Sequence, residues 1–243
     1  MKASAVLAGM RALPIADLDV ITSGAATLVL APHPDDESLG CGGLIAECCS
    51  RGQPPVIVIL TDGVGSHPAS KAFPPARLRT VRAREAQDAT RILGVPDTHL
   101  HFLNVADTVA PHAGPEFDAL VTVLAGLLRR HDCHTILAPW RHDPHGDHVA
   151  ASAMAAAAAH DAGARHWAYP VWGWTLPGDA DLPGNPPSGG RIDISRHLNL
   201  KRRAIQAHLS QHAGLITDDP QGFQMPPEFI ALFETPTETY LDP

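Results

Sequence analysis

Thr27-Leu28-Val29-Leu30-Ala31-Pro32-His33-Pro34-Asp35-Asp36-Glu37 joins a short apolar run to a dense cluster of polar side chains. The run from Thr27 to Ala31 has the length and composition of a buried strand. His33, Asp35 and Asp36 follow it, and imidazole and carboxylate groups are ligands of catalytic zinc. A strand that ends in such groups predicts one half of a hydrolytic metal site.

A second stretch repeats this chemistry. The apolar run from Thr135 to Pro139 leads through Trp140 into Arg141-His142-Asp143-Pro144-His145-Gly146-Asp147-His148. Because both runs end in histidine and aspartate, we expect the two strand ends to share one site.

Alternating apolar runs and helix-like segments predict an α/β fold in three layers, with a mostly parallel sheet between helices. We expect strands at 27–31, 55–61, 99–103 and 134–139, and helices near 39–51, 77–93, 116–131 and 149–162. A sheet order of 3-2-1-4 makes the first and fourth strands neighbours. Their loops then diverge and open a crevice, which places the metal site at the carboxyl ends of strands 1 and 4.

Beyond residue 162 the pattern weakens. We expect a strand at 169–174, a Pro- and Gly-rich loop at 177–190, a strand at 191–194 and an amphipathic helix at 196–212. No repeat or low-complexity linker divides the chain, so residues 1–243 are predicted to form one domain. Its core spans about 25–211, and the tail at 213–243 is predicted to be irregular.

Composition excludes several functional classes. The formal charge of −8, without any basic run, argues against a nucleic-acid partner. No segment approaches the roughly 20 apolar residues of a membrane span. The four cysteines form no CxxC pair, which favours a reducing compartment, and we expect a cytoplasmic protein. The composition leaves the oligomeric state open.

At its two motifs the sequence resembles the PIG-L/LmbE-like family of metal-dependent N-deacetylases, over roughly residues 25–211. Further family-like features follow in order: Thr61-Asp62-Gly63, Arg82 with Glu85 and Ala89, Leu93-Gly94-Val95, Phe102-Leu103 and His208-Leu209-Ser210-Gln211. The resemblance implies a Rossmann-like fold and a hydrolase that releases acetate from an N-acetylated amino sugar. Membrane-embedded relatives have a spanning helix that is not found here, so the resemblance implies a soluble member.

The resemblance assigns His33, Asp36 and His148 as the metal ligands. Two imidazoles, one carboxylate and an open position suit catalytic Zn²⁺, although the same donors also suit Fe²⁺. Asp35 is then free to act as general base on a water whose pKa the metal lowers towards about 7.

The remaining site residues are also taken from the resemblance. His145 is expected to face the substrate, where an imidazolium would stabilise the oxyanion and protonate the departing amine. Asp147 would orient a histidine, with His145 as the candidate. Arg82 would bind a phosphate or sugar hydroxyls, or else form an ion pair with Glu85. Asp107 would contact a sugar hydroxyl, or else cap a loop.

Other features have alternative readings. Gly40, Gly42 and Gly43 lack the spacing of a nucleotide-binding loop, so we expect them to permit close packing of a helix. Trp172 and Trp174 could stack on a sugar ring, but aromatic residues at strand spacing more often line a core.

The chain also departs from its relatives. Asp143 stands where some mycothiol-pathway relatives have a tyrosine, so neither a mechanism that uses that hydroxyl nor the substrate of that branch transfers to this chain.

We therefore predict a zinc-dependent deacetylase for an N-acetylated amino sugar of the GlcNAc type, or for its conjugate. The loops at 62–75 and 177–190 are expected to frame the pocket. Two alternatives stay open. One is a metal-dependent amidase for a non-sugar N-acyl substrate, such as an antibiotic intermediate or a thiol conjugate. The other is a binding module without activity.

Overall fold

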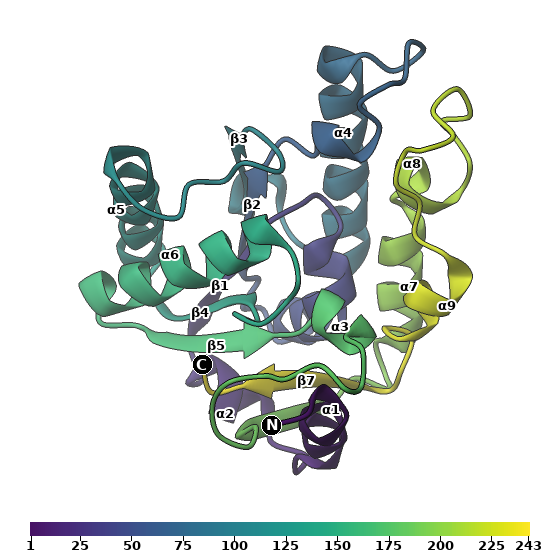
Figure 1. The fold of residues 1–243 in the computed structure, drawn as a ribbon. Helices are drawn as coiled ribbons and strands as arrows, with labels where there is room; N and C mark the ends of the chain where they lie inside the picture. Colours follow the sequence, from purple (N-terminus) through teal and green to yellow (C-terminus); the bar gives the residue numbers. More distant parts are fainter.

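A seven-stranded sheet forms the centre of the computed structural model, which describes residues 1–243 (Figure 1). The strand order is β3-β2-β1-β4-β5-β7-β6. The first five strands of this order pair in parallel, and β7 runs antiparallel to both β5 and β6. The strands are β1 Ala26–Ala31, β2 Val56–Thr61, β3 Leu100–Val105, β4 Cys133–Pro139, β5 Arg165–Tyr169, β6 Gly189–Asp193 and β7 Thr237–Leu241.

Strands β1 and β4 are neighbours at the centre of the sheet, so the predicted order 3-2-1-4 is confirmed. Leu28 is opposite Ile136, and Val29 is opposite Leu137. Both polar motifs therefore begin at the same edge of the sheet. The chain order reverses between these strands, which is where ligands bind in folds of this type.

Helices cover both faces of the sheet (Figure 1). Val29 of β1 packs into an apolar cluster with α3 Asp36–Ser50, α4 Pro75–Leu93 and α7 Leu198–Gln206. Its neighbour Leu28 packs on the opposite face, with α5 Pro115–Arg130 and α6 Gly146–Ala162. This alternation explains why β1 is apolar at successive positions, since both of its faces are buried.

The smaller elements are α1 Ala3–Ala12, α2 Leu18–Thr22, α8 Leu209–His212, α9 Pro227–Ala231 and the 3₁₀ turns η1 Val64–Ser66, η2 Asp97–His99 and η3 Trp172–Thr175. None of the helices has both the length and the hydropathy required to cross a bilayer.

Close packing of α3 against the sheet depends on its glycines. A Cβ atom on Gly43 would lie 2.5 Å from Cγ2 of Ile194, and one on Gly40 would overlap the ring of Tyr169. The prediction that these glycines permit close helix packing is confirmed. The helix begins at Asp36, three residues before the predicted start at Leu39.

The predicted strand at 169–174 is wrong. The chain leaves β5 at Tyr169 and forms the 3₁₀ turn η3. The cause is Asp143, whose carboxylate accepts hydrogen bonds from the backbone N–H groups of Val171, Trp172 and Gly173. Three donors that converge on one carboxylate require a turn, because successive N–H groups of a strand point to opposite sides.

The C-terminal predictions also need correction. The helix expected at 196–212 is divided into α7 and α8 around His208, which turns inward to contact Glu37 at 3.1 Å. The tail at 213–243 is not irregular, since it contains α9 and the sheet strand β7. The predicted strand at 191–194 corresponds to β6, which spans Gly189–Asp193.

Candidate metal centre and catalytic cavity

A cavity of about 230 Å³ lies at the carboxyl ends of β1 and β4. Its lining combines the first motif with side chains from distant segments: His33, Asp35, Asp36, Leu39, Gly65, Ser66, Arg82, Asp107, Thr108, His145, Val171, Trp172, Gln211, Phe223, Met225 and Phe229. Polar and titratable groups thus meet apolar side chains in one cavity.

His33, Asp36 and His148 converge beside this cavity, and all three are buried. Oδ2 of Asp36 lies 3.2 Å from Nδ1 of His33 and 3.3 Å from Nε2 of His148. The two imidazole rings are 5.3 Å apart between centroids. Nε2 of His148 is buried and has no hydrogen-bond partner. Two nitrogens and one carboxylate oxygen facing one another fit the donor set of a catalytic metal.

The second nitrogen of each histidine is held by carboxylates. Nε2 of His33 contacts Asp147 at 3.1 Å and Asp107 at 3.2 Å. Nδ1 of His148 contacts Asp143 at 3.0 Å. Carboxylates behind histidines fix the ring orientation in metal sites, and here they leave the remaining nitrogens facing Asp36.

Asp147 therefore orients His33, and the suggested pairing of its carboxylate with His145 is wrong. The Asp147 carboxylate also accepts backbone N–H groups from Thr108 and Ala110, which tie it to the loop after β3. Only the backbone N–H of Asp147 reaches His145, donating to Nδ1 at 3.2 Å. Spacing along the chain could not distinguish the two histidines, because His33 is 114 positions away.

Further groups of donors overlap with this set. His33, His145 and His148 offer atoms within 4.8 Å of one another, as do His33, Asp107 and Asp147. The chain therefore has a His/Asp group that can bind a metal ion. His33 belongs to both of these groups and also to the predicted set with Asp36.

The electrostatics of the buried groups favour a cation. Burial opposes charge on His33, but Asp107, Asp147 and Asp36 outweigh it and raise the pKa of His33 well above its usual range. Against the same effect of burial, Asp36 and Asp143 raise the pKa of His148 to about 9. Burial also opposes ionisation of Asp36, yet the imidazoles of His148 and His33 hold its pKa well below normal. The surrounding carboxylates thus stabilise positive charge between the two histidines.

Asp35 lies beside the predicted ligands and has an unusual backbone. Its φ of 154° with ψ of −27° is rare for a residue with a side chain, and the residue immediately precedes α3. Oδ2 accepts a hydrogen bond from Nη2 of Arg82 at 3.0 Å. Burial raises the pKa of Asp35 to about 6, although Arg82 opposes the shift. Backbone strain of this kind is concentrated at functional positions.

Arg82 is almost fully buried and reaches the same turn from α4. Its guanidinium donates to the carbonyl oxygens of Gly63 and Pro34 as well as to Asp35. The alternative ion pair with Glu85 is wrong, because Glu85 accepts hydrogen bonds from the backbone and side chain of Ser210. Nε of Arg82 is buried without a partner. The side chain thus supports Asp35 through its terminal nitrogens and also lines the cavity.

His145 precedes α6 and lies at the cavity wall, with its ring 4.6 Å from that of His33. Burial and the neighbouring imidazoles of His33 and His148 lower the pKa of His145. The neutral ring is therefore favoured, in contrast to the expected imidazolium.

Asp107 lines the cavity and caps a loop at the same time. It accepts the backbone N–H of Gly65 at 2.8 Å and also contacts His33. The loop-capping alternative is thus confirmed, and the carboxylate has the additional partner His33, which sequence reasoning missed.

Three aromatic side chains of the cavity lining, Trp172, Phe223 and Phe229, pack together as an aromatic wall. Trp172 stacks on Phe229 at 4.7 Å and meets Phe223 edge-on at 5.5 Å. The C-terminal segment reaches this place because Phe223 donates its N–H to the carbonyl of Ser66. The loop at 177–190 lines a different cavity, so only the first of the two loops expected to frame the site does so.

Comparisons with known proteins agree with this geometry. A 1D-myo-inositol 2-acetamido-2-deoxy-alpha-D-glucopyranoside deacetylase from Nocardia farcinica is 29% identical over 261 residues, with 83% of this chain and 84% of the relative covered. A diacetylchitobiose deacetylase from Thermococcus kodakarensis is 29% identical over 194 residues, covering 76% of this chain and 69% of the relative.

Solved structures share the fold. The conserved protein TT1542 from Thermus thermophilus aligns with a TM-score of 0.63 and 27% identity, covering 90% of this chain and 94% of that one. The family described as PIG-L: GlcNAc-PI de-N-acetylase matches residues 28–159, which contain both motifs, most of β1 and the whole of β4. Because this match covers more than half of the sequence, the chain belongs to the PIG-L family.

Proposed function

We propose that this protein is a metal-dependent N-deacetylase that hydrolyses the acetamide of an N-acetylated amino sugar, or of its conjugate. One observation supports the proposal above all others. His33 and His148 converge on the carboxylate of Asp36, and other carboxylates hold the second ring nitrogen of each histidine. Asp35 lies beside them at the cavity. The similar deacetylases from Nocardia farcinica and Thermococcus kodakarensis supply the substrate class.

We assign His33, Asp36 and His148 as the residues that would hold Zn²⁺. Bound there, the ion supplies Lewis-acid polarisation of the amide carbonyl and lowers the pKa of a water molecule. Asp147, Asp107 and Asp143 keep the two histidine rings in the orientation that this requires.

Asp35 is the general base in this proposal. Its carboxylate accepts the proton of the attacking water, while Arg82 fixes the carboxylate at the cavity wall. A base whose pKa lies near neutrality combines a sufficient deprotonated fraction with useful basicity.

His145 is the proposed general acid. Its Nδ1 accepts the N–H of Asp147, which leaves Nε2 to exchange a proton with the substrate. The neutral ring is favoured, and because Nδ1 accepts a hydrogen bond its proton lies on Nε2. His145 therefore passes a proton from Nε2 to the departing amine nitrogen and regains the proton that Asp35 removed from the water.

Different parts of the cavity lining suit different parts of the substrate. The polar wall of Arg82 and Asp107 suits the sugar hydroxyls, and we propose both residues as substrate contacts. The aromatic wall of Trp172, Phe223 and Phe229 suits an apolar ring face or carrier group. The same wall would equally serve a non-sugar N-acyl substrate, which remains the second candidate.

The test is acetate release by enzyme of defined metal content, across GlcNAc conjugates and non-sugar N-acyl amines. We expect turnover of the sugar conjugates. An Asp35→Asn enzyme should retain its metal and lose at least about 100-fold in kcat. Loss of metal from that variant, or full activity in it, would remove Asp35 from the mechanism. Stoichiometric metal without acetate release from any compound would refute the deacetylase.

Metal analysis after anaerobic purification tests the cofactor. We expect zinc in the purified enzyme and turnover by the zinc-reconstituted protein. Activity restored by Fe²⁺ and abolished by Zn²⁺ would replace zinc with iron.

A further inference from the structure

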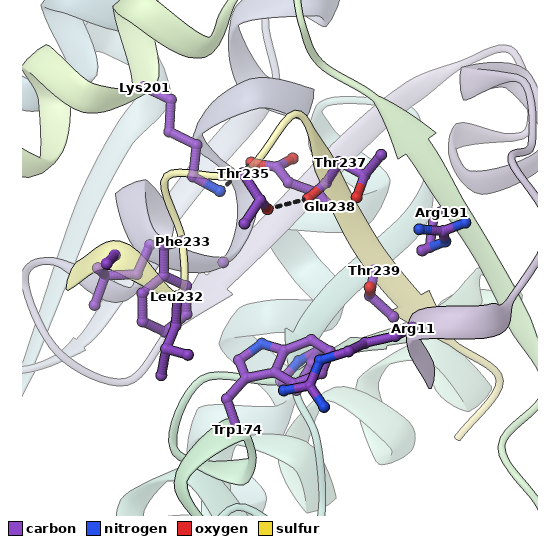
Figure 2. Close-up of a pocket in the computed structure, with 14 residues that line it drawn as sticks. Arg11, Trp174, Arg191, Lys201, Leu232, Phe233, Thr235, Thr237, Glu238 and Thr239 are labelled. Atoms are coloured by element: carbon purple, nitrogen blue, oxygen red, sulfur yellow. Dashed lines mark hydrogen bonds and ion pairs between the residues drawn. The ribbon is translucent and has the colours of Figure 1, made fainter. Parts of the chain in front are cut away.

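A second cavity, of about 250 Å³, borders the N-terminal turns of α3 at Leu39 and Gly40, and Figure 2 shows side chains that line it. Its walls come from α1, α3, η3, β6, α7 and the C-terminal segment. Leu39 is the one residue that borders both this cavity and the catalytic one. The metal-site residues lie outside this lining, so the second cavity is not an extension of the metal centre.

The cavity contains an excess of positive charge. Arg11, Arg191 and Lys201 line it, against the single carboxylate of Glu238. Nζ of Lys201 lies 2.7 Å from Oε1 of Glu238, and both side chains are almost completely buried. These two charges cancel one another, so the two arginines determine the charge of the cavity.

Glu238 has no remaining capacity to neutralise the arginines. Besides Lys201, its oxygens accept the backbone N–H groups of Gly43 and Leu44 and the hydroxyl of Tyr240. The carboxylate is thus occupied by structural contacts that join β7 to α3.

Neither arginine has a carboxylate partner. Arg191 donates Nε to the carbonyl of Leu13 at 2.8 Å, and its terminal nitrogens make no hydrogen bond. The guanidinium of Arg11 lies over the ring of Trp174, 5.2 Å from its centroid, and makes no hydrogen bond or ion pair (Figure 2). These two guanidinium groups without a counter-charge give the cavity a positive charge in a protein whose net charge is −8.

The rest of the lining is amphipathic. Leu232, Phe233 and the Trp174 ring form apolar surface on one side, and the threonines of β7 face them in Figure 2. A guanidinium fork matches the geometry of carboxylate and phosphate, and an apolar wall suits a ring or a short hydrocarbon body.

We propose that this cavity is a second ligand site, specific for a small organic anion with a carboxylate or phosphate group on an apolar body. The free terminal nitrogens of Arg191 bind the anionic group, the Arg11 guanidinium over Trp174 adds positive charge to the same cavity, and Trp174, Leu232 and Phe233 contact the body. The site differs in position and chemistry from the metal centre, and the proposal does not depend on the deacetylase activity.

Titration calorimetry on the metal-loaded enzyme tests the second site with two aromatic anions, benzoate and phenyl phosphate. Inorganic phosphate serves as the anionic group alone, and benzyl alcohol serves as the neutral analogue. We expect at least one aromatic anion to bind more tightly than both inorganic phosphate and the alcohol. The comparison of benzoate with phenyl phosphate identifies the preferred anionic group. Added NaCl should weaken the binding.

Variants locate the binding. Arg11→Gln and Arg191→Gln should each weaken it about tenfold or more, since each removes charged hydrogen-bond donors. Arg84→Gln is the matched control, because Arg84 is exposed on α4, has no ion pair and lies outside the cavity lining. Arg11 makes no hydrogen bond in the fold, so its variant tests the site even if Arg191→Gln fails to fold.

Three results would each overturn the proposal. They are no detectable binding of either aromatic anion, equally tight binding of benzyl alcohol, and unchanged affinity in the Arg11→Gln enzyme. The last result would place the anion elsewhere, for instance at the metal.

Discussion

The Asp143 carboxylate joins two parts of the catalytic cavity. It contacts His148, and it accepts the three N–H groups that form the turn after β5. This turn, η3, places Trp172 in the aromatic wall. One side chain therefore determines both a histidine orientation and the position of a substrate-facing ring.

Asp143→Asn tests this dual role. The amide keeps one acceptor oxygen but places an NH₂ group where an acceptor is required, so both sets of contacts are disturbed. We expect metal affinity to fall about 10- to 100-fold, measured by competition with a chelating dye. Asp132→Asn is the control, because that side chain is 95% exposed. Unchanged metal affinity in Asp143→Asn would show that His148 does not need this carboxylate.

Acid stability should depend on a histidine outside the candidate metal site. Burial lowers the pKa of His166, in β5, to about 4, and its Nε2 is buried without a hydrogen bond. The folded pKa lies below the unfolded value of about 6.5, so the unfolded chain binds more protons between these two values. The free energy of unfolding should therefore fall as the pH decreases from about 6.5 towards 4.

His166→Leu removes this proton linkage. At pH 4.5 the wild-type protein should lose roughly 1–3 kcal/mol more than the variant, relative to pH 7.5, in urea titrations of the two proteins. His160→Gln, at an exposed position on α6, should leave the wild-type pH dependence unchanged. Identical pH dependence of wild type and His166→Leu would contradict the linkage.

Individual motif residues were predictable from the sequence because they follow strands directly. His33, Asp36 and His148 come together as the two strand ends indicated. The carboxylates behind the histidines were not assignable in this way. Asp107 and Asp147 both contact His33 across long sequence separations. In the sequence, Asp143 stood out only as a difference from relatives that have a tyrosine at that position.

At the scale of elements, α3 shows how a helix is brought against the sheet. Its glycines lie where β5 and the segment after β6 approach most closely. The strands and helices between residues 26 and 162 were predictable from apolar runs and helix-forming segments, whereas α1 and α2 near the N-terminus were not predicted. η3 was not, since the turn is imposed by Asp143 and not by the aromatic residues within it.

Gly43→Ala should destabilise the protein. Its Cβ would lie 2.5 Å from Cγ2 and 2.6 Å from Cβ of Ile194, so rotation of that side chain alone cannot relieve the overlap. We expect a loss of about 1–3 kcal/mol in the free energy of unfolding, measured in urea. Gly126→Ala in α5 is the matched control, because no atom lies within 4 Å of its added Cβ.

The control should change stability in the opposite direction. Alanine favours a helix interior, so Gly126→Ala should gain about 0.5–1 kcal/mol. Equal effects of both substitutions would mean that α3 does not depend on close approach at Gly43.

Across the whole molecule, the C-terminal segment connects parts that the sequence could not assign to one another. β7 enters the sheet between β5 and β6, and Phe223 and Phe229 complete the cavity wall. The tail was expected to be irregular because the pattern of apolar runs and helix-like segments weakens after residue 162. The C-terminal segment is structured by contacts with residues distant in the sequence, and no local apolar pattern indicates those contacts.

Substitution of the buried pair Lys201–Glu238 tests how much the contact between α7 and β7 contributes to stability. Lys201→Met would leave the Glu238 carboxylate buried without its counter-charge, and we expect a loss of about 3–5 kcal/mol in urea unfolding. Lys2→Met removes an exposed pair with Asp181 and should cost less than about 1 kcal/mol. Adding Glu238→Gln to Lys201→Met should restore part of the loss, and no restoration would exclude an unpaired charge as the cause.

The position of β7 also sets an order of assembly on the ribosome. Strands β1 to β5 emerge in sequence and can pair as the nascent chain lengthens, with both halves of the metal centre already synthesised by residue 148. The edge strand β6 must wait for residues 237–241, and the aromatic wall waits for residues 223–229. During translation, the proposed metal ligands are therefore exposed to the cell before the pocket around them has closed.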